Sequence, residues 1–397
     1  MRVTHVITRL IVGGAQENTI ASVLGLRRKS ALELTLISGP TAGPEGSLEP
    51  LVAGIPKLLT RVPELVRPVH PWKDCLAFRR LTATFRAGAP DIVHTHSGKA
   101  GFLGRLAAAR AGVPIIVHTI HGPSFGAFQG PFANTAFRAA ERLAAKVTTH
   151  FVVVSDAMRE RYLAGRVGRP EQYTKILSGF ELEPFLAARN EAPARARLGL
   201  APEDIVIGKI ARLSKLKGHE ALFAIAPGLV RSCPQIKFLL VGDGEWRAKF
   251  ERQARLAGQE QHFIFTGLVP SSAVPEMIGL TDIVVHLSAR EGLARALPQA
   301  LACGKPVVAY DCDGAKEVCR DGETGFLVKS GDLAGLSDRV LRLANDPALR
   351  DRFGRRGQEF VRERFGVDRM VDDLYQLYLR LAHTAGLGSV AVAGGRQ

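Results

Sequence analysis

The chain has 397 residues, enough for two or three ordinary domains, and its 46% hydrophobic and 23% charged residues exclude an intrinsically disordered protein. The formal net charge of +15 indicates an anionic partner, such as a phosphorylated small molecule, an acidic membrane surface or nucleic acid. The sequence contains no recognised RNA- or DNA-binding motif, so we expect no nucleic acid partner.

The cysteines and the first residues bear on the cellular compartment. The five cysteines are scattered without a C-x-x-C spacing, so the sequence predicts neither a disulfide framework nor a zinc site. Residues 1–16 are interrupted by His5 and Arg9 and do not resemble a signal peptide, and no apolar run reaches the length of a bilayer span. We therefore expect a cytoplasmic protein.

Short β-branched runs alternate with longer helical stretches along the chain. In the first half the runs are VTHVIT, LELTLIS, DIVHTHS, PIIVHTIHG and HFVVVSD. In the second half they are DIVIGKIARL, IKFLLVGDG, HFIFTG, TDIVVHLS and KPVVAYD. Apolar runs separated by helices are typical of parallel strands buried on both faces. Because the pattern occurs twice, it predicts an α/β protein with two Rossmann-like, doubly wound parallel-sheet domains.

A segment rich in proline, glycine and charge, around residues 178–200, separates the two halves. We predict a first domain over residues 1–182 and a second over 183–368. A last helix is expected over 369–384, packed back on the first domain, and a disordered tail over 385–397. The apolar residues of that helix at helical spacing are Met370, Val371, Leu374, Leu377, Tyr378 and Leu381.

Two glycines, Gly13 and Gly14, follow the first predicted strand and precede a helical stretch. Paired glycines let the backbone approach a ligand closely, and the N–H groups of a helix N-terminus bind anions. A tight turn into a helix explains the same two residues. The spacing is not that of the G-x-G-x-x-G dinucleotide fingerprint, which argues against a dehydrogenase.

Four histidines, at 94, 96, 118 and 121, stand at the ends of two predicted strands. His94 and His96 share one face of their strand because side chains alternate along it. A metal cluster is an alternative, but the carboxylates and spacing of a known metal site are missing. His121 precedes Gly122-Pro123 at a loop opening and is expected to face a ligand, whereas the other histidines fit hydrogen bonds within the core.

Two loops of the second half carry charge at the ends of predicted strands. Arg212 and Lys217, in ARLSKLKG, precede a helix, where two basic side chains can neutralise a diphosphate. Glu291 follows DIVVHLS, and Gly292 lets the chain turn closely. Because a helix starts just beyond, the backbone N–H groups of residues 293–296 are expected to point toward an anion. The alternative for Glu291 is a solvated loop acid.

The stretch SAREGLARALPQALACGKPVVAYDCDGAKEVCRDGETGFLV resembles the signature of glycosyltransferase family 4, retaining nucleotide-sugar transferases of the GT-B fold. The similarity extends in the family's order to GGAQ, DIVHTHS, HTIHG, VVVSDAMRERY, ILSGFE, ARLSKLKG, LLVGDGE and FTGLV, over residues 3 to 380. The resemblance implies a GT-B fold with a central cleft. The first domain would bind the acceptor and the second the nucleotide sugar.

The resemblance also implies roles for individual residues. Arg212 and Lys217 would grip the donor diphosphate. Glu291 would bind hydroxyls of the transferred sugar and His121 would stand near its anomeric carbon, so these two are the predicted catalytic residues. The other predicted donor-binding residues are Gly13, Gly14, Gly292, Leu293, Ala294, Arg295, Ala296 and Gln299, and the predicted nucleobase pocket is Phe265, Gly267 and Leu268.

One residue departs from the family's pattern, and one short run resembles the motif of another family. The family's second glutamate, which usually holds the ribose, is Gln299 here; an amide still donates to and accepts from hydroxyls, so we expect a weakened or altered nucleotide preference. Asp311-Cys312-Asp313 resembles the DxD metal motif of a different transferase fold, but no further ligand is identifiable. We predict no metal and no cofactor apart from the UDP- or GDP-linked donor substrate.

The implied function is transfer of a hexosyl unit, with retention, from a nucleotide diphosphate sugar to a hydroxyl of a glycan or lipid-linked acceptor. It would belong to cell-envelope polysaccharide, lipopolysaccharide or glycolipid biosynthesis. A non-catalytic nucleotide-sugar-binding protein and a GT-B sugar-nucleotide epimerase are the alternatives. The segment HPWKDCLAFRRLTATFRAG is either a helix at the inner, anionic face of the cytoplasmic membrane or one that packs its aromatic residues on the sheet.

Overall fold

The structure, a computed structural model, describes residues 1–41, 43, 45–126 and 128–387. It divides into two compact units, Met1–Gly179 with the C-terminal segment that starts at Val367, and Phe180–Gly366. The sequence placed the corresponding boundaries after residues 182 and 368. Of the predicted tail over 385–397, residues 388–397 lie outside the described part of the chain.

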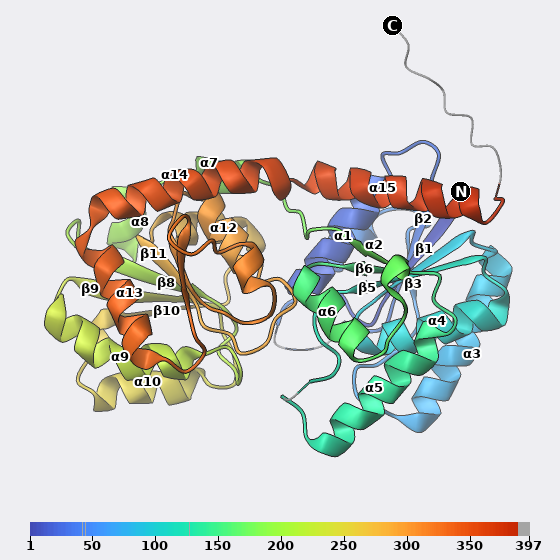
Figure 1. Cartoon of the computed structure of the whole chain (residues 1–397), viewed down its shortest axis with the longest axis horizontal. Helices are drawn as coiled ribbons and strands as arrows, with labels where there is room; N and C mark the ends of the chain where they lie inside the picture. The colour runs from blue at the N-terminus through green and yellow to red at the C-terminus, as the bar shows by residue number, and fades with distance from the viewer. Residues whose placement is uncertain (42, 44, 127, 388–397) are drawn as a thin grey trace, which may run out of the picture. The chain divides into compact units, whose positions relative to one another are not determined.

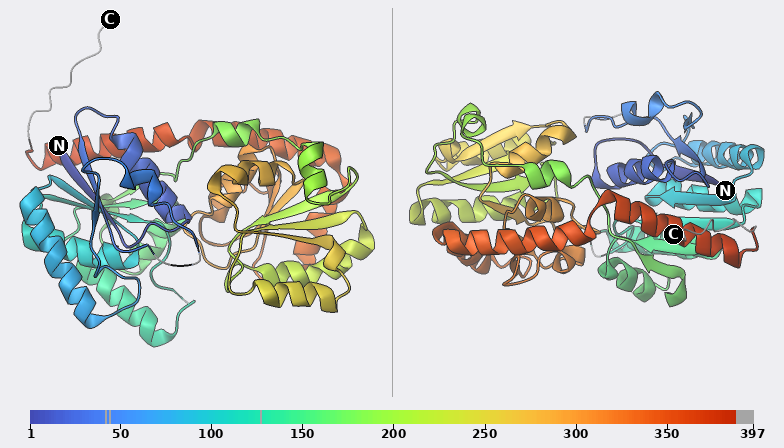
Figure 2. Two further views of the ribbon diagram at one scale, coloured as in Figure 1. Left: turned by 180° about the vertical axis from the view of Figure 1, so that it is seen from behind. Right: turned by 90° about the horizontal axis from the view of Figure 1, so that it is seen from above.

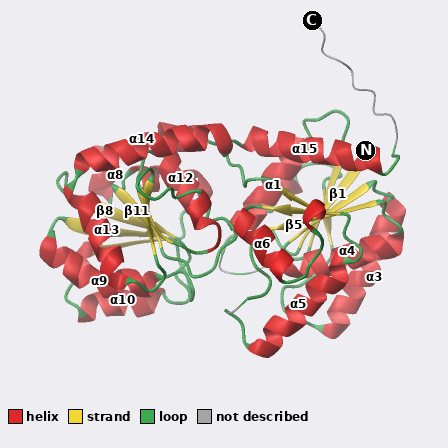
Figure 3. Ribbon diagram, in the orientation of Figure 1, coloured by secondary structure: helices red, strands yellow, loops and turns green. Residues whose placement is uncertain are grey.

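The first unit contains a parallel sheet flanked by helices on both faces (Figures 1 and 3). The described strands follow the order β3-β2-β1-β4-β5-β6-β7, and every pair is parallel. The strands are β1 (Arg2–Ile7), β2 (Glu33–Ser38), β3 (Leu59–Arg61), β4 (Ile92–His96), β5 (Ile115–Ile120), β6 (His150–Val153) and β7 (Tyr173–Lys175). The helices are α1 (Gly14–Leu26), α2 (Pro50–Ala53), α3 (Pro71–Gly88), α4 (Gly98–Ala111), α5 (Pro131–Ala145), α6 (Asp156–Ala164), the 3-10 helix η1 (Pro170–Gln172) and α15 (Val367–Thr384).

Alternation along the strands sends apolar side chains to both faces of this sheet. Val3 and Ile7 of β1 join a core with α1 and α15, whereas Val6 joins a second core with α3 and α4. Helix α15 lies close against α1, where a Cβ added at Gly25 would stand 2.3 Å from Cγ2 of Val371. The last helix is therefore part of the first unit's core.

The second unit repeats the architecture (Figures 1 and 2). Its described strands follow the order β10-β9-β8-β11-β12-β13, again all parallel. The strands are β8 (Ile205–Ile210), β9 (Ile236–Val241), β10 (Phe263–Gly267), β11 (Ile283–His286), β12 (Val307–Tyr310) and β13 (Gly325–Val328). The helices are α7 (Glu183–Ala187), α8 (Ala192–Arg197), α9 (His219–Ser232), α10 (Arg247–Leu256), α11 (Val274–Gly279), α12 (Ala296–Ala302), α13 (Leu333–Asn345) and α14 (Pro347–Arg364), with 3-10 helices η2 (Glu260–His262), η3 (Ser271–Ala273) and η4 (Asp313–Glu317).

Each sheet has one point where the winding direction of the chain reverses. In the first unit this point lies between β1 and β4, and in the second between β8 and β11. Ligands of open parallel sheets bind outside the carboxyl ends of the strands at such a point, because the loops that follow the two strands run apart. The predicted fold class, two doubly wound Rossmann-like units, is confirmed.

Helix α3 largely packs its aromatic side chains inward. Phe85 is buried and Phe78 packs against the same core, whereas Trp72 is 70% exposed. Two of the three aromatic residues, Phe78 and Phe85, therefore pack inward, as one of the two alternatives for this segment predicts. None of the helices in the described part of the chain combines the length and apolar character that a bilayer span requires.

A buried ion pair connects helices α4 and α5. The Arg105 guanidinium donates from Nη2 to Oε2 of Glu141 at 2.7 Å and from Nε to the carbonyl of Gly101 at 2.7 Å. The Arg105 side chain is fully buried and that of Glu141 is 5% exposed. Because both charges have left water, each needs the other, and the pair fixes the rotation of α5 about its axis.

We expect Glu141→Ala to lower the free energy of unfolding by about 3–5 kcal/mol, because it leaves the Arg105 charge buried and uncompensated. The double variant Arg105→Met/Glu141→Leu should lose much less, since it removes both charges. Asp368→Ala is the control: it breaks an exposed pair with Arg28 and should cost under about 1 kcal/mol. Equilibrium urea denaturation measures all three, and a loss for Glu141→Ala as small as the control's would contradict the argument.

Candidate functional site

In the second unit, the loops after β8 and β11 bring a lysine and a glutamate together at the reversal point of the sheet. Nζ of Lys217 lies 2.5 Å from Oε1 of Glu291. Both side chains are partly exposed, with 30% and 25% of their surface accessible. The structure thus unites two residues that the sequence predicted for one site.

Backbone contacts hold these two loops against each other. The N–H of Ala289 donates to the carbonyl of Leu216 at 2.9 Å. Gly218 has φ +72°, and a Cβ added there would stand 1.9 Å from the carbonyl oxygen of Leu287. Only glycine fits this close approach without displacing backbone. These backbone contacts therefore restrain the two loops that carry Lys217 and Glu291.

Asp313 is a further residue at this site, and the sequence analysis set it aside. Its Oδ2 accepts a hydrogen bond from the backbone N–H of Glu291 at 2.8 Å. Asp313 begins η4 and has φ +50°, a left-handed conformation that aspartate tolerates better than most residues. Asp313, the second aspartate of the DxD-like run, thus holds the Glu291 loop in place. An Asp-Gly pair after a strand was the available signal.

The environment keeps Glu291 ionised at neutral pH. Burial raises its pKa, but the Lys217 ammonium and its hydrogen bond to Glu291 outweigh burial and hold the pKa below its usual value. An ionised carboxylate only accepts hydrogen bonds, so Glu291 suits a partner rich in hydroxyl groups.

Three buried polar side chains interact electrostatically with this ion pair, and the sequence did not predict them. Among the described residues, Nζ of Lys209, both ring nitrogens of His219 and Nε2 of His286 have no hydrogen-bond partner. Burial, and next the charge of Lys217, lower the pKa of Lys209 to about 7. The pKa of His286 falls to about 3, mainly through burial. A lysine inside the apolar run DIVIGKIARL was the sequence signal.

The remaining predicted donor-binding residues of this unit lie after β8, before α12 and on α12. Arg212 is exposed directly after β8 and Gln299 is partly buried on α12. Arg295 lies over the ring of Phe180, at 5.8 Å from its centroid. Gly292, Leu293 and Ala294 are buried, and Ala296 is the first residue of α12. Their contacts with a ligand stay predictions.

The predicted nucleobase residues lie at the end of β10. The carbonyl of Gly267 accepts from the N–H of Gly242 at 3.1 Å, which joins this strand end to the loop after β9. Gly267 has φ +70°, Phe265 packs partly into the core and Leu268 is half exposed. A base-binding role for these residues stays a prediction.

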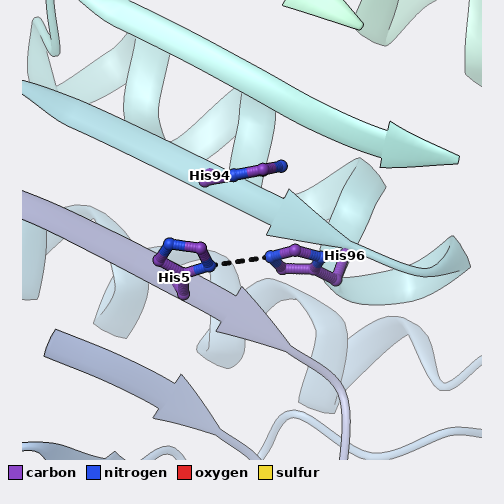
Figure 4. Close-up of side chains that lie close together, drawn as sticks. All are labelled: His5, His94 and His96. Carbon is purple, nitrogen blue, oxygen red and sulfur yellow. Dashed lines mark hydrogen bonds between the residues drawn. The ribbon is translucent and has the colours of Figure 1, made fainter. Parts of the chain in front are cut away.

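In the first unit, Gly13 caps α1 and Gly14 is its first residue. They follow β1, on one side of the reversal point, and β4 with its histidines lies on the other. His94 and His96 share one face of β4, as predicted, and His5 on β1 stands beside them (Figure 4).

The histidines are linked into a hydrogen-bonded chain that the sequence did not predict. Nδ1 of His5 lies 2.9 Å from Nε2 of His96, and Nδ1 of His96 lies 3.0 Å from Nε2 of His121. The Tyr378 hydroxyl of α15 lies 3.2 Å from Nε2 of His5 and 2.5 Å from Nδ1 of His94. His121, the predicted catalytic residue, thus stands at one end of a buried chain.

Burial lowers the pKa of the three inner histidines, His5 to about 3 and His94 and His96 well below the usual value. They are neutral at physiological pH. One ligand nitrogen of each lies within 4.8 Å of the others, a spacing that a metal ion could bridge. The hydrogen bonds above, with one from Nε2 of His94 to Oγ1 of Thr119 at 2.6 Å, already use both nitrogens of each ring.

The chain matches two protein families, one in each unit. Residues 13–177 match the family described as "Glycosyl transferase 4-like domain", and residues 190–360 match "Glycosyl transferases group 1". Among curated relatives, "Putative glycosyltransferase EpsD" of Bacillus subtilis is 28% identical over 78% of this chain and 82% of its own length. "UDP-Gal:alpha-D-GlcNAc-diphosphoundecaprenol alpha-1,3-galactosyltransferase" of Escherichia coli is 27% identical over 80% and 82%.

Solved structures share the fold. HepE of Anabaena, solved in complex with UDP-glucose, superposes with a TM-score of 0.78 at 22% identity, covering 96% of this chain and 100% of that one. Sucrose-phosphate synthase of Thermosynechococcus elongatus gives 0.79 at 20% identity, over 97% and 100%. The family matches together span nearly the whole described chain, and the chain belongs to the GT-B glycosyltransferases as a glycosyltransferase family 4-like enzyme.

Proposed function

We propose that this glycosyltransferase moves a hexosyl unit from a UDP-linked donor to a hydroxyl of a glycan or lipid-linked acceptor, in cell-envelope polysaccharide, lipopolysaccharide or glycolipid biosynthesis. The contact between Lys217 and Glu291 at the reversal point of the second sheet carries the proposal. The UDP-galactose donor named for the Escherichia coli relative and the UDP-glucose bound to HepE support the choice of nucleotide and sugar class.

The two charged residues have complementary tasks toward such a donor. The Lys217 ammonium, with the exposed Arg212 guanidinium from the same loop, neutralises charge that grows on the departing diphosphate. Glu291 accepts hydrogen bonds from sugar hydroxyls and so orients the anomeric carbon. Gln299 meets the ribose as an amide, which donates and accepts. In this scheme side chains supply the neutralising charge, and no metal cofactor is required.

Retention of configuration is part of the proposal, and the contacts of the two carboxylates favour a route without an enzyme nucleophile. Glu291 is held by Lys217, and Asp313 accepts from the Glu291 backbone, so neither is disposed as a nucleophile. In the proposed step, the acceptor oxygen bonds to the anomeric carbon on the face from which the phosphate oxygen departs. The acceptor's proton passes to the departing phosphate, which leaves as a nucleoside diphosphate.

A surface stripe on α5 supports contact with a membrane that carries the acceptor. Phe132, Ala136, Ala139 and Leu143 recur at helical spacing on one face, and all four are exposed, Phe132 at 89% and Leu143 at 50%. Glu141, on the opposite face, is fixed inward by its buried ion pair. An apolar stripe held outward in this way is typical of helices that lie in a membrane interface.

Basic residues lie beside the stripe. Arg142, Lys146, Arg166 and Arg169 line a shallow hollow of about 440 Å³ at the end of α5, although Arg169 also pairs with Glu171. Each cation near an anionic membrane surface contributes roughly 1 kcal/mol. Helix α5 is the first helix after His121 in the chain, and it belongs to the unit that is predicted to bind the acceptor. We propose α5, and not α3, as the membrane-contacting helix.

Lys217→Ala and Glu291→Ala are each expected to lower kcat/KM for sugar transfer by about 10²–10³, because each removes preorganised charge at the reacting centre. Lys215→Ala is the matched control, since Lys215 is an exposed lysine of the same loop and should keep the wild-type rate. Release of nucleotide that depends on an added acceptor measures the reaction. Near-wild-type rates for both site variants would refute the assignment.

UDP is expected to raise the melting temperature of the protein more than GDP or ADP at equal concentration, because a ligand that binds the folded state stabilises it. A larger rise in melting temperature with GDP than with UDP would show that the donor nucleotide is GDP.

With an α-linked UDP-hexose the product linkage should again be α, as proton NMR of the isolated product would report. A β-linked product would exclude the same-face route.

The double variant Phe132→Ser/Leu143→Ser is expected to lower binding to phosphatidylglycerol-containing vesicles at least about tenfold, because two apolar side chains no longer enter the interface. Vesicle flotation measures the bound fraction. Trp72→Ser, on α3, is the control and should bind as the wild type does. Equal flotation of the double variant, or equal binding to purely zwitterionic vesicles, would contradict the proposed contact.

A further inference from the structure

Four side chains from four separate segments of the first unit form what we call the histidine relay: Tyr378, His5, His96 and His121. Tyr378 belongs to α15, His5 to β1, His96 to β4, and His121 follows β5. The three links, from oxygen to nitrogen and between ring nitrogens, measure 3.2, 2.9 and 3.0 Å. Each link is within hydrogen-bonding distance, so the relay is continuous from the last helix to the predicted catalytic histidine.

A neutral imidazole carries one N–H donor and one bare nitrogen acceptor, so its two hydrogen bonds run in opposite senses. His5 and His96 are neutral because they are buried, and both nitrogens of each ring are used within the relay. If His5 donates from Nδ1, then His96 must accept at Nε2 and donate from Nδ1 to His121. If His5 accepts at Nδ1, every donor along the relay is reversed.

The Tyr378 hydroxyl has a different donor role in each of these two arrangements. It has a single hydrogen but lies within reach of two ring nitrogens, Nε2 of His5 and Nδ1 of His94. If it donates to His5, then Nε2 of His121 is an acceptor and the proton of a neutral His121 is on Nδ1. If it donates to His94, whose Nε2 then donates to Thr119, a neutral His121 carries its proton on Nε2.

We propose that the Tyr378 hydroxyl, acting through His5 and His96, sets which ring nitrogen of His121 carries the proton. Tyr378, His5 and His96 are thus positioning residues for His121. Nδ1 of His121, the nitrogen outside the relay, is a donor in one arrangement and an acceptor in the other. The consequence for catalysis rests on the proposed function, because it requires that His121 meets the donor sugar or the acceptor hydroxyl.

The other face of the sheet offers a matched control. His118 of β5 is as deeply buried as the relay histidines, but its Nδ1 lies 2.9 Å from Oγ1 of Thr95 and its ring packs toward Gly101 of α4. Replacing His118 therefore disturbs a buried imidazole of the same unit without cutting a link of the relay.

The decisive experiment uses the full-length protein with ¹⁵N-labelled histidine and no substrate. Two-bond ¹H–¹⁵N correlation spectra assign the protonated nitrogen of each ring. Tyr378→Phe removes only the hydroxyl oxygen. It is expected to shift the ¹⁵N resonances of the His121 ring, because the ratio of its two neutral tautomers changes from that of the wild type. His5→Gln, a second cut in the relay, should also move them, and His118→Gln should leave them unchanged.

Activity provides the second measurement. Tyr378→Phe is expected to lower kcat by about 10- to 100-fold, the range known for outer partners that orient a functional histidine at metal sites, with little change in KM for the donor. Unchanged His121 resonances in both relay variants would overturn the proposal. So would a metal ion bound stoichiometrically at His5, His94 and His96, measured by elemental analysis, since it would replace the hydrogen bonds between the rings. If the resonances shift but the wild type transfers no sugar, the relay stands and the proposed function fails.

Discussion

The reversal of winding between two neighbouring parallel strands is the constraint on which both candidate sites depend. At β1 and β4, and again at β8 and β11, the following loops run to opposite faces of the sheet and leave polar groups at the strand ends. Gly13 and the histidines occupy one such point, and Lys217 and Glu291 the other. The positions of the chemistry thus follow from strand order before any single side chain is considered.

In the second unit, contacts that involve the backbone fix the positions of the loops that carry Lys217 and Glu291. Gly218 lies against the carbonyl of Leu287, and Asp313 accepts a hydrogen bond from the N–H of Glu291. The loop that carries Glu291 is therefore restrained by two neighbouring loops. The ammonium of Lys217 lowers the pKa of Glu291 and also that of buried Lys209. A single charge therefore contributes to two pKa values, although burial is the larger cause for Lys209.

Much of the fold was predictable because apolar runs and their spacing are local properties of the sequence. The association of Lys217 with Glu291 was also predictable, since both follow strands of one sheet. Asp313 was not, because its contact depends on a left-handed backbone conformation and a neighbour 22 residues away. The period of a strand placed His94 and His96 on one face, but only the strand order and the return of α15 reveal His5 and Tyr378 as their partners.

The buried imidazoles at the two candidate sites are paired in different ways. In the first unit the buried imidazoles satisfy one another, so their cost of burial is met without any ligand. In the second unit Lys209, His219 and His286 lack partners among the described residues, and an unmade buried hydrogen bond costs about 1–3 kcal/mol. The first unit thus pairs its buried imidazoles with one another and with hydroxyl groups, whereas the second leaves an ammonium and ring nitrogens of two imidazoles unpaired, within the described part of the chain, in the electrostatic reach of Lys217.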